Sequence, residues 1–148
     1  MHRSIVGAAA AATALSLTAG SGPAVARHPD PLEDVPYHPE WGSVKGHPGV
    51  LKRGCHTYRF SYTVTPPEGI WAIEVFISAP GSKHVAGGGF IDGYDAKSDI
   101  GTYKLCKPTV RYGRFRIEAK ISVDDGSGHV QEGRTATDFY RLHRPHRR

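Results

Sequence analysis

The sequence lacks the local motifs of the common enzyme classes. It has no H-E-x-x-H zinc motif, no G-x-S-x-G nucleophile turn and neither glycine pattern of a phosphate-binding loop. The triple glycine 87–89 fits none of these motifs, and we interpret it as a bulge or bend in an edge strand. We therefore expect no cofactor. A hydrolase with scattered Ser, His and Asp residues leaves no local motif, so that class stays open.

Long apolar runs are also scarce, and the one that occurs extends from Ile5 to Leu17. Arg3 precedes it and Ala24-Val25-Ala26 follows it, a pattern typical of a secretory signal peptide. No other stretch approaches the roughly 18 apolar residues that a membrane span requires. We expect residues 1–26 to be removed, leaving a secreted, extracellular protein without a transmembrane segment.

Only two cysteines are present, Cys55 and Cys106. In an exported protein a pair of cysteines predicts a disulfide, and a loop of about 50 residues gives it roughly 4 kcal/mol in the chain-entropy model. A nucleophilic dyad of Cys55 with His56 is the alternative. Neighbours on a strand point to opposite faces, so adjacency argues against that dyad.

Acidic residues are outnumbered, with 14 Asp and Glu against 19 Lys and Arg. The last eight residues, RLHRPHRR, hold four arginines, two histidines and no carboxylate. Such a tail attracts polyanions, for example an anionic cell-envelope polymer, or is a solvated segment that keeps the domain soluble. Specific nucleic-acid recognition is not expected. The candidate polyanion-binding residues are Arg141, Arg144, Arg147 and Arg148.

Helical periodicity is missing, and apolar residues alternate with polar ones instead. The clearest alternation predicts strands at 55–64, 70–78 and 113–123. Weaker patterns predict further strands at 84–92, 102–106 and 134–142. Short strands separated by Gly and Pro turns indicate an all-β fold, an antiparallel immunoglobulin-like sandwich of about six or seven strands, with a small β-barrel as the alternative.

The domain organisation follows from these patterns. Residues 27–50 carry five prolines, which exclude helix and central strand and predict an extended lead-in. The sandwich is expected at 51–142 and a basic tail at 143–148.

The order Cys55, Trp71, Cys106 resembles an immunoglobulin-like domain, whose inter-sheet disulfide packs against a core tryptophan. Tyr103 stands three residues before Cys106 rather than two, so the strands that the bridge joins stay open. From Trp41 to Pro145 the chain also resembles the small, signal-bearing, one-disulfide proteins that actinobacteria export. That resemblance implies no active-site residue.

Two further groups are candidates for ligand contact. Asp92, Asp95 and Asp99 are the best oxygen ligands for calcium, although their spacing differs from the helix-loop-helix calcium loop and ordinary turn formation is the alternative. Four aromatic residues lie out of phase with the apolar faces or near turns and could stack on sugars: Phe76, Tyr94, Tyr112 and Tyr140.

We interpret the chain as a secreted, non-enzymatic binding or structural protein that acts at or outside the cell envelope. Its partner would be an anionic envelope polymer or an extracellular protein. One alternative is a small hydrolase with a scattered Ser, His and Asp site, which a cleft with a Ser or Asp hydrogen-bonded to His84 or His129 would favour. Another is an exported protease inhibitor with an exposed loop at 79–83 or 65–69.

Overall fold

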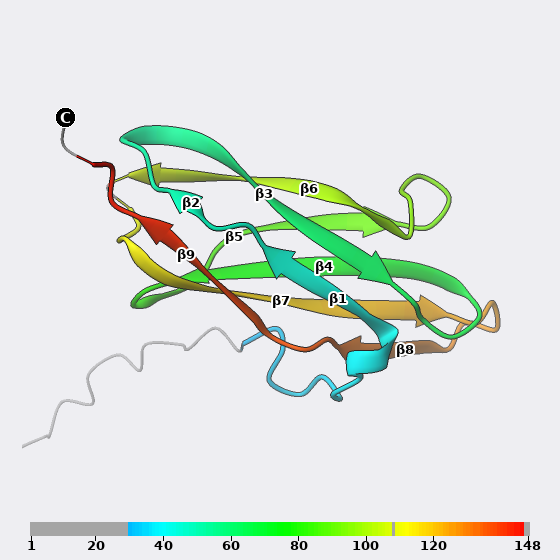
Figure 1. The fold of residues 1–148 in the computed structure, drawn as a ribbon. Coiled ribbons are helices and arrows are strands. Elements are labelled where there is room, and N and C mark those ends of the chain that lie inside the picture. Colours follow the sequence, from blue (N-terminus) through cyan, green and yellow to red (C-terminus); the bar gives the residue numbers. More distant parts are fainter. Residues whose placement is uncertain (1–29, 108, 147–148) are drawn as a thin grey trace, which may run out of the picture.

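The computed structural model describes residues 30–107 and 109–146, which form nine strands in two facing sheets (Figure 1). The strands are β1 (Gly42–Gly46), β2 (Gly49–Val50), β3 (Gly54–Val64), β4 (Ile70–Ala79), β5 (Ser82–Ile91), β6 (Ser98–Lys107), β7 (Gly113–Asp124), β8 (Val130–Arg134) and β9 (Asp138–His143). A short 3-10 helix, η1 (Pro39–Trp41), precedes β1. The predicted all-β sandwich is confirmed, with nine described strands instead of six or seven.

Sheet A has the strand order β2-β9-β7-β4-β5, and β8 pairs with β7 beyond the end of β9. Sheet B has the order β1-β3-β6. The predicted strand at 134–142 is broken, because β8 ends at Arg134 and β9 begins at Asp138. The triple glycine lies in β5, an edge strand of sheet A, as expected. Its three residues pair regularly with β4, and the register shift between the two strands lies between Ile77 and Ala79 instead.

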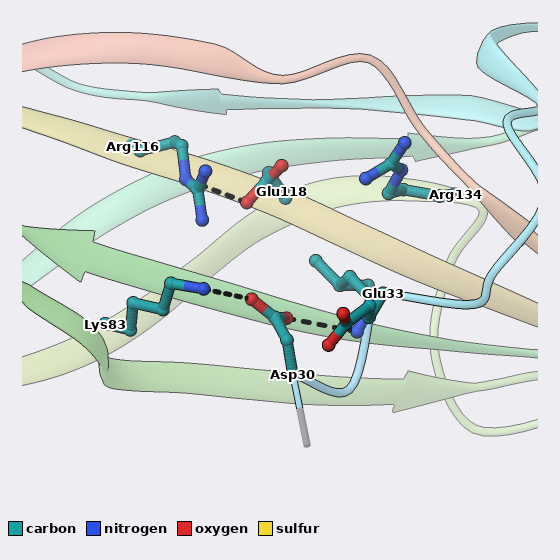
Figure 2. Close-up of a pocket in the computed structure, with 7 residues that line it drawn as sticks. Asp30, Glu33, Lys83, Arg116, Glu118 and Arg134 are labelled. Carbon is teal, nitrogen blue, oxygen red and sulfur yellow. Dashed lines mark hydrogen bonds and ion pairs between the residues drawn. The ribbon is translucent and has the colours of Figure 1, made fainter. Parts of the chain in front are cut away.

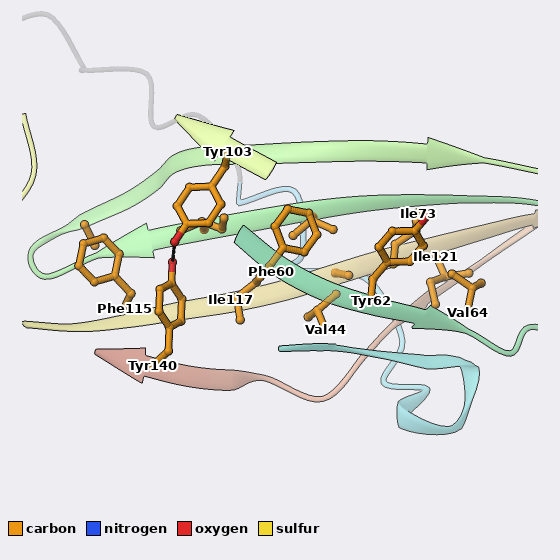
Figure 3. Packing of buried hydrophobic residues seen from close by; sticks show 14 of the residues in the cluster. Val44, Phe60, Tyr62, Val64, Ile73, Tyr103, Phe115, Ile117, Ile121 and Tyr140 are labelled. Carbon is orange, nitrogen blue, oxygen red and sulfur yellow. Dashed lines mark hydrogen bonds between the residues drawn. The ribbon is translucent and has the colours of Figure 1, made fainter. Parts of the chain in front are cut away.

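The core lies between the sheets and is built by the alternation seen in the sequence. In sheet A, β4 and β7 direct apolar residues inward in matched pairs such as Val75 with Ala119 and Ile77 with Ile117. From sheet B, Phe60, Tyr62 and Val64 meet them (Figure 3). The alternate residues of these strands form the outer faces of the sandwich.

The N-terminal segment joins the sandwich, so the boundary at residue 51 was wrong. β1 pairs antiparallel with β3, and β2 pairs parallel with β9. Trp41 and Val44 are buried in the core, and Leu32 is buried near sheet A. β1 is an edge strand, so prolines on either side of it cost no ladder hydrogen bond.

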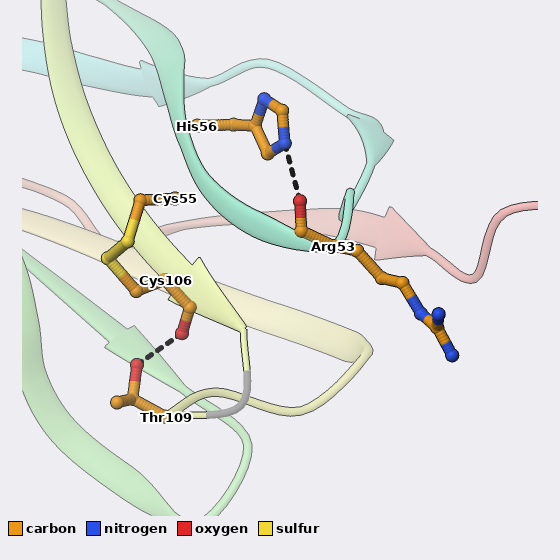
Figure 4. The surroundings of a disulfide bond; sticks show 5 residues. All are labelled: Arg53, Cys55, His56, Cys106 and Thr109. Atoms are coloured by element: carbon orange, nitrogen blue, oxygen red, sulfur yellow. Dashed lines mark hydrogen bonds between the residues drawn. A yellow bond between two sulfur atoms is a disulfide. The ribbon is translucent and has the colours of Figure 1, made fainter.

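The predicted disulfide between Cys55 and Cys106 is confirmed, but it joins neighbouring strands of one sheet (Figure 4). Cys55 shares the outward phase of Thr57 and Arg59, so the bridge lies on the outer face of sheet B. Trp71 is buried in β4 of the other sheet. The strands left open by the sequence are thus β3 and β6, and the bridge differs from the inter-sheet bridge of the immunoglobulin-like domains that the cysteine order resembles.

The Cys–His dyad is excluded by the same geometry. Both cysteines are consumed in the disulfide. The His56 ring turns to its own loop, where Nε2 lies 2.6 Å from the carbonyl oxygen of Arg53 (Figure 4). His56 contributes to the local turn and not to a thiol nucleophile.

A buried hydrogen bond links the two sheets. The hydroxyl groups of Tyr103 in β6 and Tyr140 in β9 are 2.7 Å apart (Figure 3). Burial raises the pKa of Tyr103 to about 12 and raises the pKa of Tyr140 as well. A side chain on Gly46 would overlap the Tyr140 ring, so glycine is required where β1 crosses it. The bond ties β9 to the far sheet.

Replacing Tyr140 by phenylalanine is expected to lower the free energy of unfolding by about 1–3 kcal/mol, because it leaves the Tyr103 hydroxyl buried without its partner. Replacing both tyrosines should cost less than the two single changes added together, because no polar group is then left unpaired. Urea unfolding of the three variants measures this. If the double variant lost as much stability as the two single variants added together, the hydrogen bond itself would contribute nothing.

The same pair should make the fold sensitive to alkali. Both folded-state pKa values are raised, so the contribution of the neutral pair is complete below about pH 10 and is lost as pH rises toward 12. The double phenylalanine variant should lose less stability over that window. Tyr94, which is 88% exposed, provides the control substitution.

Two sets of predicted features fall outside the described residues. They are the signal peptide at 1–26 and the last two arginines, Arg147 and Arg148. Within residues 30–107 and 109–146 no helix has the length and apolar character needed to cross a membrane.

Candidate anion-binding face

Two arginines lie directly opposite each other on the outer face of sheet A. Arg114 of β7 is the register partner of Arg141 of β9, and both side chains are exposed. The neighbouring residues Phe115 and Tyr140 point into the core, so the arginines point outward. Like charges in directly opposed positions destabilise a sheet, so this pair lowers the stability of the folded state. Such a pair needs an explanation other than stability.

Two more cations extend this surface. Arg116 is the next outward residue of β7. Lys83 of β5 lies near it, because both side chains line the same two surface pockets, which are described below. The Arg114 guanidinium lies over the Phe139 ring, with Cζ 3.8 Å from the ring centroid. This stacking holds the guanidinium in place through a cation–π contact. We call Lys83, Arg114, Arg116 and Arg141 the basic face.

A buried carboxylate holds Arg116. Glu118 follows Arg116 on the outward phase of β7 and is only 5% exposed. The Nε of Arg116 donates to Glu118 Oε2 at 2.9 Å, and the hydroxyl of Thr137 donates to Oε1 at 2.9 Å. Because both carboxylate oxygens are engaged, the ion pair has one defined geometry.

Asp30 holds Lys83 in a similar way. Its Oδ2 lies 2.7 Å from Lys83 Nζ, and its Oδ1 lies 3.6 Å from Nε2 of His84. The hydrogen bond from Lys83 lowers the pKa of Asp30. A charged pocket of about 280 Å³ lies on the outer side of sheet A (Figure 2). Its charged lining residues are Asp30, Glu33, Lys83, Arg116, Glu118 and Arg134.

The structure brings together only part of the predicted polyanion site. Arg141 lies on the basic face, and Arg144 is exposed just after β9. Sequence reasoning missed Lys83, Arg114 and Arg116. The signal for the two arginines was present, because Arg-x-Arg occupies the outward phase of the strand at 113–123.

The three candidate calcium ligands each accept a hydrogen bond from a nearby backbone N–H group. Asp95 accepts the backbone N–H of Ile91 at 2.8 Å, while Asp92 and Asp99 each accept the N–H of the following residue. Among the described residues no group of three His, Cys, Asp or Glu side chains is placed to hold a metal ion. These contacts are typical of turn-forming aspartates.

The four aromatic candidates do not gather into one surface. Tyr140 was wrong as a ring for stacking on sugars, because the side chain is buried and its hydroxyl is bonded to Tyr103. Tyr112 packs partly against the core under Lys107, whose Nζ lies 4.2 Å from its ring centroid. Phe76 lies beside His84, and Tyr94 is exposed in the β5–β6 loop.

In the described part of the chain, the imidazole rings of His84 and His129 make no hydrogen bond to a serine hydroxyl. The backbone N–H of His84 donates to Ser78 Oγ at 3.2 Å, whereas its ring faces Asp30. His129 lies in the exposed β7–β8 loop. Of the two loops named for an inhibitor, 79–83 is a tight turn in which Ala79 pairs with Ser82.

Comparison with known proteins does not assign a family. No family model matches the chain, and a search of curated proteins found no similar sequence.

Proposed function

We propose that this is a secreted, non-enzymatic β-sandwich protein that binds an anionic polymer at or outside the cell envelope through the basic face. The observation that carries the proposal is the direct opposition of Arg114 and Arg141 on an exposed sheet surface. The disulfide supports an oxidising compartment, where such bridges persist.

The outer face of sheet B distributes its cations differently from that of sheet A. Its cations Lys45, Arg59 and Lys104 each stand opposite a small hydroxyl residue. None of these three cations stands directly opposite another, so this surface avoids the closest like-charge contacts. On sheet A, Arg114 and Arg141 are directly opposed, and a polyanion would relieve the repulsion between them. Arg116 and Lys83 lie nearby, and each is already paired with a carboxylate.

Replacing Arg114 and Arg141 together by glutamine is expected to weaken retention on an immobilised polyanion by about 10-fold at moderate salt. The salt dependence should also become shallower, because fewer counterions are released. The measurement is elution from a dextran sulfate matrix. The matched control changes Arg59 and Lys104 to glutamine on the outer face of sheet B, which removes the same charge and should alter retention far less.

The tail is tested separately. The truncation must begin after His143, because Leu142 is fully buried and pairs with Gly49. We expect removal of 144–148 to reduce retention less than the double glutamine change. Unaltered retention of that double variant, together with loss of retention on truncation, would place binding in the tail and contradict the proposal.

A further inference from the structure

We infer that the basic face contains a discrete subsite for a sulfate or phosphate monoester, in the hollow beside the turn between β4 and β5. This inference rests on the proposed function and names the anionic group that the polymer would carry. The hollow has a volume of about 330 Å³. Its lining residues are Ser78, Ala79, Gly81, Ser82, Lys83, Arg114 and Arg116.

The lining has the chemistry of an oxyanion site. It contains three cations and the exposed Ser82, and none of its residues is acidic. Arginine forks, an ammonium group and a hydroxyl all donate hydrogen bonds to an anion. The adjoining pocket in Figure 2 shares Lys83 and Arg116 with this hollow but contains the carboxylates Asp30 and Glu118.

Those carboxylates act as supports behind the subsite. Glu118 occupies the Nε of Arg116, which leaves the N–H groups of the two terminal nitrogens for another acceptor. Asp30, which lines the adjoining pocket, accepts a hydrogen bond from Lys83. Phe139 supports Arg114 by stacking. Donors held in this way lose little conformational entropy on binding, which favours a preorganised site.

The number of donors selects the class of anion. A carboxylate has two oxygens and is matched by a single bidentate fork. A sulfate or phosphate monoester presents three free oxygens and can accept two forks and an ammonium from different directions. Arg114 and Arg116 supply the forks and Lys83 the ammonium.

A second hollow makes the site suited to a polymer. It has a volume of about 320 Å³ and is lined by Arg114, Phe139, Tyr140 and Arg141. Arg114 therefore borders both hollows. A chain with anionic groups on successive units can place one group on each side of this residue.

The test compares three polymers with the same backbone and charge density: dextran sulfate, dextran phosphate and carboxymethyl dextran. We expect the wild-type protein to bind the sulfate or the phosphate form about 10-fold more tightly than the carboxylate form. Arg114→Lys together with Arg116→Lys keeps the charge but removes the forks, and should abolish that preference. Arg59→Lys is the matched control and should retain it.

The outcomes separate the subsite from the proposed function. Equal wild-type binding to all three polymers would overturn the subsite and leave polyanion binding intact, whereas binding to none would overturn both. A preference that survives in the lysine variant, with its melting temperature unchanged, would also overturn the subsite. Preference for sulfate over phosphate, or the reverse, supports the subsite and identifies the ester.

Discussion

Replacing Phe60 by alanine is expected to lower the free energy of unfolding by about 3–5 kcal/mol. Phe60 is fully buried in β3, at the centre of the contact between the sheets (Figure 3). Its ring packs near Phe90 and Tyr103, with centroid distances of 6.0 Å and 6.2 Å. Truncation would leave a cavity that these rigid neighbours cannot fill. Urea unfolding measures the loss, and Arg59→Ala, on the outer face, should change stability by less than about 0.5 kcal/mol.

The Phe60 ring depends on a glycine in the neighbouring strand of the same sheet, where Gly101 is its register partner. A Cβ on Gly101 of β6 would overlap the ring, and one on Gly88 of β5 would lie 3.6 Å from it. Gly101→Ala alone should therefore cost about 1–3 kcal/mol through overpacking. In the Phe60→Ala background the same change should cost little, because the added methyl enters the cavity. Additive losses in this double-mutant cycle would contradict the proposed fit of ring to glycine.

Removal of the disulfide has the other large expected effect. Changing Cys55 and Cys106 together to serine should lower the free energy of unfolding by about 4 kcal/mol, because the bridge closes a loop across a sequence separation of 51 in the unfolded chain. A small domain has only about 5–15 kcal/mol of stability, so this is a large share.

The folded state should nevertheless keep its structure without the bridge. The cysteines lie on the outer face of sheet B, and the ladder between β3 and β6 continues from Gly54–Lys107 to Thr63–Ser98. We expect the near-UV spectrum of the double serine variant to match that of the wild type at low urea concentration. A loss below about 1 kcal/mol would show that loop closure contributes little here. Loss of the near-UV signal at low urea concentration would instead show that the bridge is needed to maintain the native side-chain packing.

The strands were the most predictable part of the fold. The alternation at 55–64, 70–78 and 113–123 corresponds closely to β3, β4 and β7, because each has one face in the core. β1, β2 and β8 were missed because they are short and lie at sheet edges, where few buried side chains impose a pattern. The prolines of 27–50 concealed an edge strand that packs on the core through Val44.

The candidate site was less predictable. Arg141 was selected for its place in a basic tail, whereas its structural partner Arg114 is 27 positions away and becomes its neighbour only through the pairing of β7 with β9. Tyr140 was selected as lying out of phase with the apolar faces or near a turn, but strand β9 directs it inward to Tyr103. A phase assigned without knowing the strand boundaries can place a side chain on the wrong face.

The sequence by itself determined the all-β class, the strands with one buried face and the pairing of the only two cysteines, because alternation and cysteine number are local or countable properties. Only the tertiary structure decided which strands are neighbours. That choice placed the disulfide on the outside of sheet B and Arg114 opposite Arg141 on the outside of sheet A. Cross-strand register depends on contacts between residues far apart in the chain, and a single sequence does not record them.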